Sequence, residues 1–173
     1  MELVSLTQAD MVRFVKTVYR QAPVFKDNKT SPYPLLSAKS AFGGNCVLQA
    51  TGVLQDGVLQ CQALFTRHRH NQSQLVLSFF EALPNAHQAV ELLFSEARRI
   101  GAGLGCTALV AGLDGHCNYS LGFLASSFDS APSFGQSYHP AYYHNYFDKW
   151  APVPLTSFWH DLSLSPADPV GKH

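Results

Sequence analysis

QLVLSFFEALPNAHQAVELLFSEARRIGAGLGCTALVA, residues 74–111, is the stretch that decides the fold of this chain. Its first part, Gln74 to Glu81, is apolar on both faces, which predicts a central strand covered on both sides. Ala86 to Ile100 repeats apolar residues at helical spacing, and Cys106 to Ala111 is again apolar enough for a buried strand. Strand, helix and strand together predict a right-handed crossover that joins two parallel strands.

The ends of the expected helix carry local signals. Asn85 is a good N-cap residue, because its side chain can accept a hydrogen bond from a free N–H group of the first turn. Arg98 and Arg99 lie near the carboxyl end, where the helix dipole favours cations. Gly101 is placed to act as a C-cap. These signals predict one complete helix between the two strands.

Upstream of this unit, Cys46 to Thr66 predicts a β-hairpin. Two β-rich runs flank Asp56-Gly57, and an Asp-Gly step is a strong turn signal because glycine accepts a positive φ. The second run buries one face, since polar residues alternate with its apolar ones, which are Leu59, Cys61, Ala63 and Phe65. Together with the strand at residues 74–81, the hairpin predicts three strands that follow one another in one sheet.

The register of this hairpin bears on the cysteines. A turn centred on Asp56-Gly57 places Cys46 opposite Arg67 and Cys61 opposite Gly52, so the two cysteines do not face each other. A disulfide between them is not expected. We interpret the cysteines as buried free thiols, which behave as small hydrophobic residues.

The amino-terminal residues predict a strand followed by a helix. Glu2 to Leu6 is a short β-rich run. Thr7 and Asp10 then form an acidic variant of the capping box that starts helices. Met11, Val15 and Val18 recur at helical spacing and predict a stripe that faces the core.

The remaining segments are less regular. Gln21 to Gly44 contains three prolines and a Gly-Gly pair, which favour loops. Pro140 to Phe147 predicts a short helix, and Leu155 to Leu164 a last strand. Together the elements predict one domain, residues 1–173, of the α/β (α+β) class. Its expected architecture is a mixed, mostly antiparallel central sheet with helices on both faces and one parallel strand–helix–strand unit.

Composition and charge restrict the partners that we expect. The chain has 173 residues with 12 basic and 12 acidic side chains, and this balance argues against a nucleic-acid partner. No stretch approaches the roughly 20 apolar residues that cross a bilayer, so no membrane partner is expected. The amino terminus lacks the basic region and apolar run of a signal peptide. We therefore expect a cytoplasmic protein.

A family resemblance lies in the carboxyl half. The run GFLASSFDSAPSFGQSYHPAYY, residues 122–143, resembles a segment of a largely uncharacterised family of bacterial GNAT-like proteins. SFFEAL, residues 78–83, resembles the Phe-rich central strand of that family, which ends in Glu. The positions that match the family pattern in register are Asn118, Gly122, Phe128, Asp129, Pro132, Tyr138, Pro140, Tyr142 and Tyr143. The chain is therefore similar to a divergent member of the GNAT acyltransferase superfamily, and the resemblance implies the GNAT fold.

The resemblance implies transfer of an acyl group from acetyl-CoA, or another acyl-CoA, to a small-molecule amine. Backbone N–H groups at the start of the long helix would hold the pyrophosphate, because helix amino termini bind anions. The cofactor-binding candidates at that place are Leu83, Asn85, Ala86, His87 and Gln88. A tyrosine would protonate the departing thiolate, and the catalytic candidates are Tyr143 and Tyr146. The substrate-binding candidates are Asn118, Asp129, Tyr138 and Tyr142.

The sequence departs from the family pattern at two of these places. Residues 83–88 contain no glycine, although the family's phosphate loop uses glycines to let the backbone approach the phosphates. The alternative interpretation there is an ordinary capped helix. In the family, a tyrosine acts as the general acid of the reaction, and Phe147 stands at its position here. The alternative for the nearby tyrosines is a place in the core, because aromatic residues on a short helix often belong to a core. Asn118 could instead cap a helix, and Asp129 could close a turn.

Two other hypotheses stay open. A non-catalytic ligand-binding domain could keep the GNAT scaffold after losing the cofactor loop. A metal-dependent hydrolase is suggested only by the histidines, among which His68 and His70 share one face of an extended chain. Without a third ligand at recognisable spacing, a solvated basic turn is the better interpretation, and no bound metal is expected. The site could also be completed by a second copy of the chain, in a homodimer.

Overall fold

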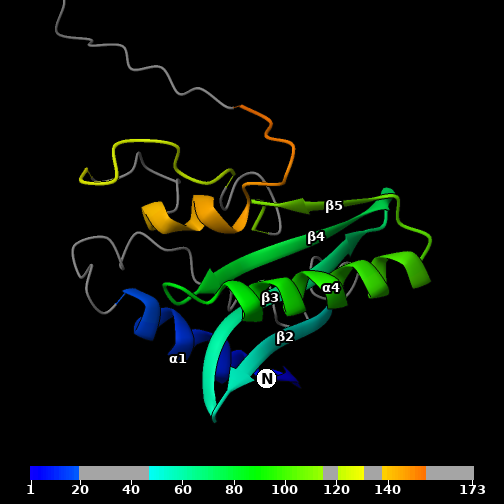
Figure 1. Cartoon of the computed structure of the whole chain (residues 1–173). Coiled ribbons are helices and arrows are strands. Elements are labelled where there is room, and N and C mark those ends of the chain that lie inside the picture. The colour runs from blue at the N-terminus through cyan, green and yellow to red at the C-terminus, as the bar shows by residue number, and fades with distance from the viewer. Residues whose placement is uncertain (20–46, 115–120, 131–137, 155–173) are drawn as a thin grey trace, which may run out of the picture.

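The computed structural model describes residues 1–19, 47–114, 121–130 and 138–154. In chain order, its elements are β1 (Glu2–Ser5), α1 (Gln8–Val18), β2 (Val47–Gln55), β3 (Val58–His68), β4 (Asn71–Ala82), α4 (His87–Gly103), β5 (Ala108–Ala111) and the 3-10 helix η3 (Ala141–Tyr146). The five strands form one sheet in the order β1-β2-β3-β4-β5 (Figure 1). All neighbours are antiparallel except β4 and β5, which are parallel.

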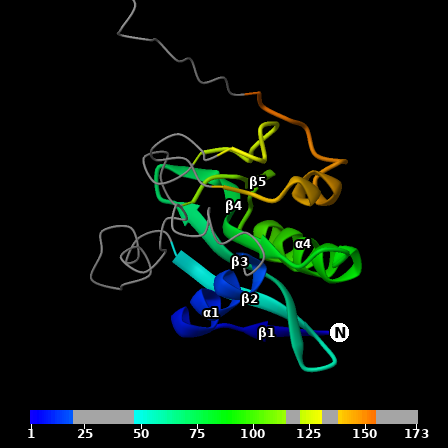
Figure 2. The ribbon, with the colours of Figure 1, turned by 90° about the vertical axis from the view of Figure 1, so that its left-hand side faces the viewer.

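The sheet is covered by a helix on each face (Figure 2). On one face Met11 of α1 packs with Leu64 and Phe79. On the other face α4 packs against the side chains that alternate with these along β3 and β4, among them Ala63 and Phe65. The prediction of a mixed sheet with helices on both faces and one parallel strand–helix–strand unit is confirmed.

The first helix begins as the sequence predicts. The backbone N–H of Thr7 donates to the Asp10 carboxylate at 3.0 Å, and the N–H of Asp10 donates to the Thr7 hydroxyl at 3.2 Å. These reciprocal bonds form the capping box. The hydrogen bond from the Thr7 side chain is the main cause that lowers the pKa of Asp10. Of the expected stripe only Met11 is buried, and Phe14, which the sequence prediction missed, is buried beside it.

The hairpin turn is confirmed, but its expected register is wrong by one residue. Asp56 and Gly57 both have positive φ, 51° and 75°, as a two-residue type I′ turn requires. Cys61 lies opposite Val53, because the register shifts between Val53 and Leu54. Cys61 is a free thiol, and burial raises its pKa to about 12. Cys46 lies outside the described residues.

Both predicted ends of the long helix are corrected. The N-cap is Ala86, with no side-chain cap, because Asn85 takes a left-handed φ of 63° instead of the extended conformation of a capping residue. The helix runs on past Gly101, which is buried against Leu75. It ends before Gly105, whose φ of 73° supplies the left-handed residue after the C-cap.

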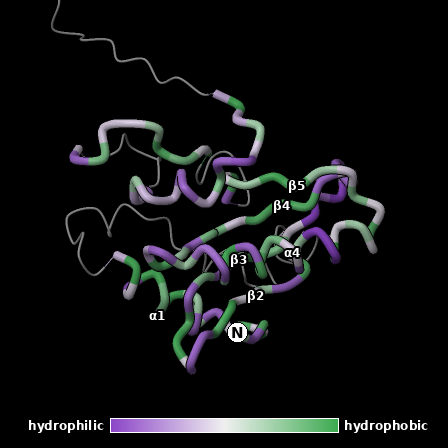
Figure 3. Tube along the Cα trace, in the orientation of Figure 1, coloured by the Kyte–Doolittle hydropathy of each residue, from purple (hydrophilic) through white to green (hydrophobic). Residues whose placement is uncertain are grey.

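The other boundaries differ by a few residues. The strand expected from Cys106 begins at Ala108, and the helix expected over 140–147 is a 3-10 helix over Ala141–Tyr146. Figure 3 shows hydrophobic residues along β5 and the adjoining part of β4, and hydrophilic residues at the turn between β3 and β4. The expected loops at 21–44 and the strand at 155–164 lie outside the described residues. Among the helices of the described part, none is long and apolar enough to span a membrane.

Candidate functional site

The candidate site lies where β4 continues beyond its parallel partner. The pairing of β4 with β5 runs from Gln74 opposite Ala108 to Leu77 opposite Ala111. β4 then extends five residues further, to Ala82. The strand is irregular at this point, since Phe79 has a positive φ of 51° and the register with β3 shifts between Gln62 and Leu64. An edge of β4 is therefore left without a strand beside it in the described part of the chain.

The residues after β5 make hydrogen bonds to this part of β4, where no described strand lies beside it. The Ser78 hydroxyl donates to the Leu113 carbonyl at 2.8 Å, and the Phe79 N–H donates to the carboxylate of Asp114. Asp114 is 5% exposed, so its contact with the backbone is shielded from water. The residues after β5 thus hold the irregular part of β4 in place.

Two tyrosines of η3 bind the last residue of β4. The Tyr143 hydroxyl accepts from the Ala82 N–H at 3.0 Å and donates to a carboxylate oxygen of Glu81 at 2.6 Å. The Tyr142 hydroxyl donates to the Ala82 carbonyl at 2.9 Å. Both backbone groups of Ala82 are therefore bonded by phenol groups, on the side that faces away from β3.

A third tyrosine binds the turn between β4 and α4. The Tyr146 hydroxyl accepts from the Ala86 N–H at 3.1 Å and donates to the Leu83 carbonyl. Its ring contacts that of His87, with 5.0 Å between the centroids. Tyr146 therefore connects η3 directly to the first residues of α4.

A buried carboxylate lies at the centre of these contacts. Glu81 is fully buried, and it interacts with the hydroxyls of Tyr143 and Tyr19. Burial, followed by the charge of Glu81, raises the pKa of both phenols well above the ordinary tyrosine value. Both therefore stay protonated at neutral pH. Tyr143 donates its proton to the carboxylate, and the Tyr19 hydroxyl donates to the backbone carbonyl of Tyr138 at 3.1 Å.

Aromatic rings fill the space between β4, α4 and η3. Phe80 is at the centre, and five ring centroids lie 5.1 to 6.4 Å from its own; they belong to Phe94, Phe123, Tyr143, Tyr146 and Phe147. Pairs of this kind prefer edge-to-face contacts, and four of the five are edge-to-face. The 3-10 helix is thus packed onto the site as part of one core.

The start of α4 could receive an anion. Its N-cap residue Ala86 makes no side-chain cap, and the next two residues, His87 and Gln88, are exposed. The first N–H groups of a helix have no partner within the helix, and their dipoles favour negative charge. The side-chain cap that the alternative interpretation assumed is absent, because Ala86 makes no side-chain cap hydrogen bond.

The structure brings together some of the sequence-predicted residues and not others. Leu83, Ala86, Tyr142, Tyr143 and Tyr146 share the hydrogen bonds given above, and the carbonyl of Tyr138 joins them through Tyr19. Asn85, His87 and Gln88 are exposed beside the start of α4. Asp129 is exposed on the loop before η3, and Asn118 lies outside the described residues.

Sequence reasoning missed three residues of this site, namely Tyr19, Glu81 and Asp114. Glu81 carried a usable signal, because it is the single charged residue in a strand predicted to be covered on both faces, and a buried carboxylate must be paired. Tyr19 and Asp114 had no local signal, since contacts between distant parts of the chain bring them there.

The two histidines of the β3–β4 turn bond within that turn. The Arg69 Nε–H donates to the His70 ring at 2.9 Å, and the His70 N–H donates to the His68 ring at 3.3 Å. Among the residues that the structure describes, no three His, Cys, Asp or Glu side chains are grouped so as to hold a metal ion. These contacts fit the solvated basic turn that the sequence favoured.

Comparison with known protein families and with curated protein sequences finds no match for this chain. Comparison with solved structures does find similar chains, and all those named below are acetyltransferases.

The aminoglycoside N-acetyltransferase AAC(6')-Iy, in complex with a bisubstrate analogue of coenzyme A, has a TM-score of 0.49 at 12% identity, over 92% of this chain and 97% of the other. A ribosomal-protein-alanine N-acetyltransferase from Brucella melitensis biovar Abortus 2308 has a TM-score of 0.47 at 13% identity, over 92% and 96%. An aminoglycoside acetyltransferase from an uncultured soil metagenomic sample, in complex with sisomicin, has a TM-score of 0.48 at 11% identity, over 93% and 95%. The backbone of this chain is similar to those of these acetyltransferases over most of its length.

Proposed function

We propose that this protein is an acyl-CoA-dependent N-acyltransferase that transfers an acetyl or other acyl group to a small amine. One observation carries the proposal: beyond Leu77, β4 has no strand beside it in the described part of the chain, and this edge leads directly to the start of α4, which has no side-chain cap. Peptide groups along a strand edge can bind the amide-containing arm of coenzyme A, and helix N–H groups can bind its pyrophosphate. The carboxyl-half resemblance to GNAT-like proteins implies the same ligand.

The ligand would take over hydrogen bonds that tyrosines make in the free protein. The Ala82 N–H and carbonyl, now bonded to Tyr143 and Tyr142, would pair with an amide group of the pantetheine arm. The N–H groups of His87 and Gln88 would bind the pyrophosphate. Binding would therefore displace phenol hydroxyls from the backbone, while their rings could remain packed in the aromatic core.

The chemistry requires two proton movements. The amine nitrogen forms a bond to the thioester carbonyl carbon, the carbon–sulfur bond breaks, the amine gives its proton to water, and the thiolate gains a proton from a tyrosine. Tyr143 and Tyr146 are the proposed proton donors. The raised pKa of Tyr143 keeps it protonated, but it also makes the phenol a weak acid while Glu81 is bonded to it. Tyr143 can give up its proton readily only after ligand binding loosens that bond.

A second candidate function, a non-catalytic binding domain, predicts that the same tyrosine contacts persist. If the hydroxyls of Tyr142, Tyr143 and Tyr146 keep their backbone partners, the strand edge and the turn before α4 stay closed to the pantetheine arm. The domain would then be a non-catalytic binding module on the same scaffold. The two candidates differ in one measurable property, which is the affinity for coenzyme A.

Thermal unfolding of the whole protein with and without acetyl-CoA tests the proposal. A ligand at 100 times its dissociation constant stabilises the folded state by ~2.7 kcal/mol, which raises the melting temperature visibly. We expect such a rise with acetyl-CoA. An unchanged melting temperature at millimolar ligand would favour the non-catalytic module.

The substitution His87→Glu tests whether coenzyme A binds at the start of α4. A carboxylate at the start of α4 repels a pyrophosphate by roughly 1 kcal/mol, so we expect the affinity for coenzyme A to fall about fivefold. The matched control is His68→Glu, the same change at the opposite end of β4, which should leave the affinity unchanged. Equal effects of the two variants would argue against the helix start as the binding site.

A further inference from the structure

The 3-10 helix η3 occupies backbone groups that the acyl-CoA would use. The Tyr143 hydroxyl accepts from the Ala82 N–H, and the Tyr142 hydroxyl donates to the Ala82 carbonyl. Together these two phenols imitate an amide group, which also offers one acceptor and a donor. Ala82 is fully buried, so water does not compete for its backbone groups. The pantetheine arm, which contains amide groups, and η3 therefore compete for the same place.

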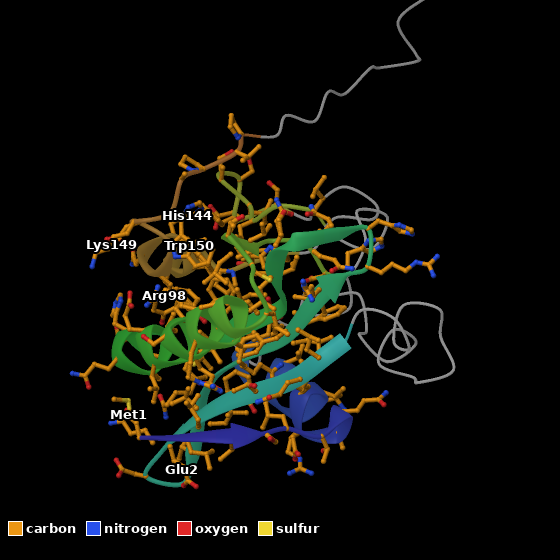
Figure 4. The ribbon with its side chains drawn as sticks, turned by 90° about the vertical axis from the view of Figure 1, so that its right-hand side faces the viewer. Met1, Glu2, Arg98, His144, Lys149 and Trp150 are labelled. Carbon is orange, nitrogen blue, oxygen red and sulfur yellow. The ribbon has the colours of Figure 1, made fainter. Side chains whose placement is uncertain are left out.

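The side of η3 that carries His144 is bonded to another part of the chain, residues 121–130. The His144 Nε2–H donates to the Leu124 carbonyl at 2.6 Å, and the Phe128 ring meets the imidazole edge-on, with 5.8 Å between the centroids. A 3-10 helix turns once in about three residues, so His144 and Tyr143 point to different sides. Figure 4 shows His144 on the side of η3 that faces away from α4. The helix is therefore bonded to β4 on one side and to residues 121–130 on another.

Residues 121–130 are themselves attached to the end of β5 and to the aromatic core. The Gly122 N–H donates to the Gly112 carbonyl at 2.6 Å. The Phe123 ring packs against that of Phe147, directly after η3, with 4.8 Å between the centroids. This segment is thus a fixed support, and a side chain bonded to it holds η3 in the position in which its phenols cover β4.

We propose that η3 is an autoinhibitory element, which closes the acyl-CoA site and is held in the closed position by the bond between His144 and Leu124. The inference rests on the proposed function, because it concerns access to the same ligand site. A ligand that binds only the open protein has an apparent dissociation constant equal to the intrinsic one divided by the open fraction. A change that weakens the closed position without touching the ligand therefore tightens binding.

His144→Ala removes the bond to Leu124 and keeps all three phenols. A single hydrogen bond changes an equilibrium by roughly two- to tenfold, so coenzyme A should bind this variant two- to tenfold more tightly than the wild type. Titration calorimetry on the full chain measures the difference. Asn145→Ala is the matched control, because Asn145 is the next residue of η3, is also exposed, and makes no side-chain hydrogen bond in the part of the chain that the structure describes. Its affinity should equal that of the wild type.

A second variant and a second ligand test the competition itself. Tyr142→Phe removes the hydroxyl that donates to the Ala82 carbonyl, so this carbonyl becomes available to the ligand. We expect tighter coenzyme A binding here too, although a hydrogen bond has been deleted from the protein. ADP carries a pyrophosphate but no pantetheine arm, so its affinity should be the same for the wild type and all three variants.

The remaining outcomes separate the inference from the proposed function. Unchanged or weaker coenzyme A binding in both His144→Ala and Tyr142→Phe, with a wild type that binds, would overturn the inference and leave the proposed function intact. An equal gain in Asn145→Ala, or an equal gain for ADP, would also overturn it. Binding by His144→Ala and Tyr142→Phe but not by the wild type would support both. Failure of the wild type and of every variant to bind coenzyme A would overturn both.

Discussion

Glu81 and Tyr143 form the contact on which the candidate site depends. The carboxylate is fully buried, and the phenol that donates to it at 2.6 Å is also bonded to the backbone of β4. Leaving a buried polar group without a partner costs about 1–3 kcal/mol, and more when the group is charged. Removing this one hydroxyl therefore affects both the strand edge and the carboxylate.

We predict that Tyr143→Phe lowers the free energy of unfolding by about 1–3 kcal/mol, because it removes the hydrogen bond to the Ala82 N–H and one of the hydrogen bonds to Glu81. Tyr142→Phe should cost less, since Tyr142 is only half-buried and water can replace its bond to the Ala82 carbonyl. Urea unfolding at pH 7 measures both. Equal losses would contradict a special role for the carboxylate contact.

The same phenols predict how stability depends on alkaline pH. Burial raises the pKa of Tyr19 and Tyr143 in the folded state, so the unfolded chain ionises first as the pH rises. Their stabilising contribution is therefore complete below the ordinary tyrosine pKa of about 10 and decreases above it. Unfolding free energies between pH 8 and 11 should fall less steeply for Tyr143→Phe than for the wild type. Parallel curves would contradict the assignment.

Among the elements, α4 shows which features local sequence signals predict and which features depend on packing against the sheet. The apolar spacing of residues 86–100 predicted the helix correctly, but both predicted ends were wrong. Gly101 does not stop the helix, because it is buried against Leu75 and takes part in the core. Asn85 does not cap it, because the chain turns there in the left-handed conformation. Capping rules alone could not distinguish these cases, since the outcome depends on contacts with the sheet.

Two glycines at the end of α4 give a paired prediction. Gly105 has a φ of 73° with no atom near its absent side chain, so Gly105→Ala should cost about 1 kcal/mol for conformational reasons alone. Gly103 lies within the helix and is equally open, so Gly103→Ala should stabilise the protein by up to about 1 kcal/mol. Thermal unfolding shows whether each substitution raises or lowers the stability of the protein. A destabilised Gly103→Ala would mean that the helix ends earlier than Gly103.

For the whole molecule, the sequence predicted the arrangement of the sheet better than the contents of the site. Alternation along β3 and continuous apolarity along β4 depend on burial, which a single sequence shows directly, and the resulting sheet order was confirmed. The site depends on contacts between residues far apart in the chain, such as Tyr19 with Tyr138 and Asp114 with Phe79. No periodicity encodes those contacts. The roles proposed for Tyr143, Tyr146 and the start of α4 remain predictions about one shared place in the fold.

The most direct test of the account follows backbone amide signals by NMR while acetyl-CoA is added to the protein. If acetyl-CoA lies along the edge of β4 that no described strand covers, with its pyrophosphate at the start of α4, the largest changes should occur at the amides of Ala82, His87 and Gln88. The turn between β3 and β4, around Arg69, should be unaffected. Unchanged spectra at millimolar acetyl-CoA, or changes confined to other parts of the chain, would contradict the account.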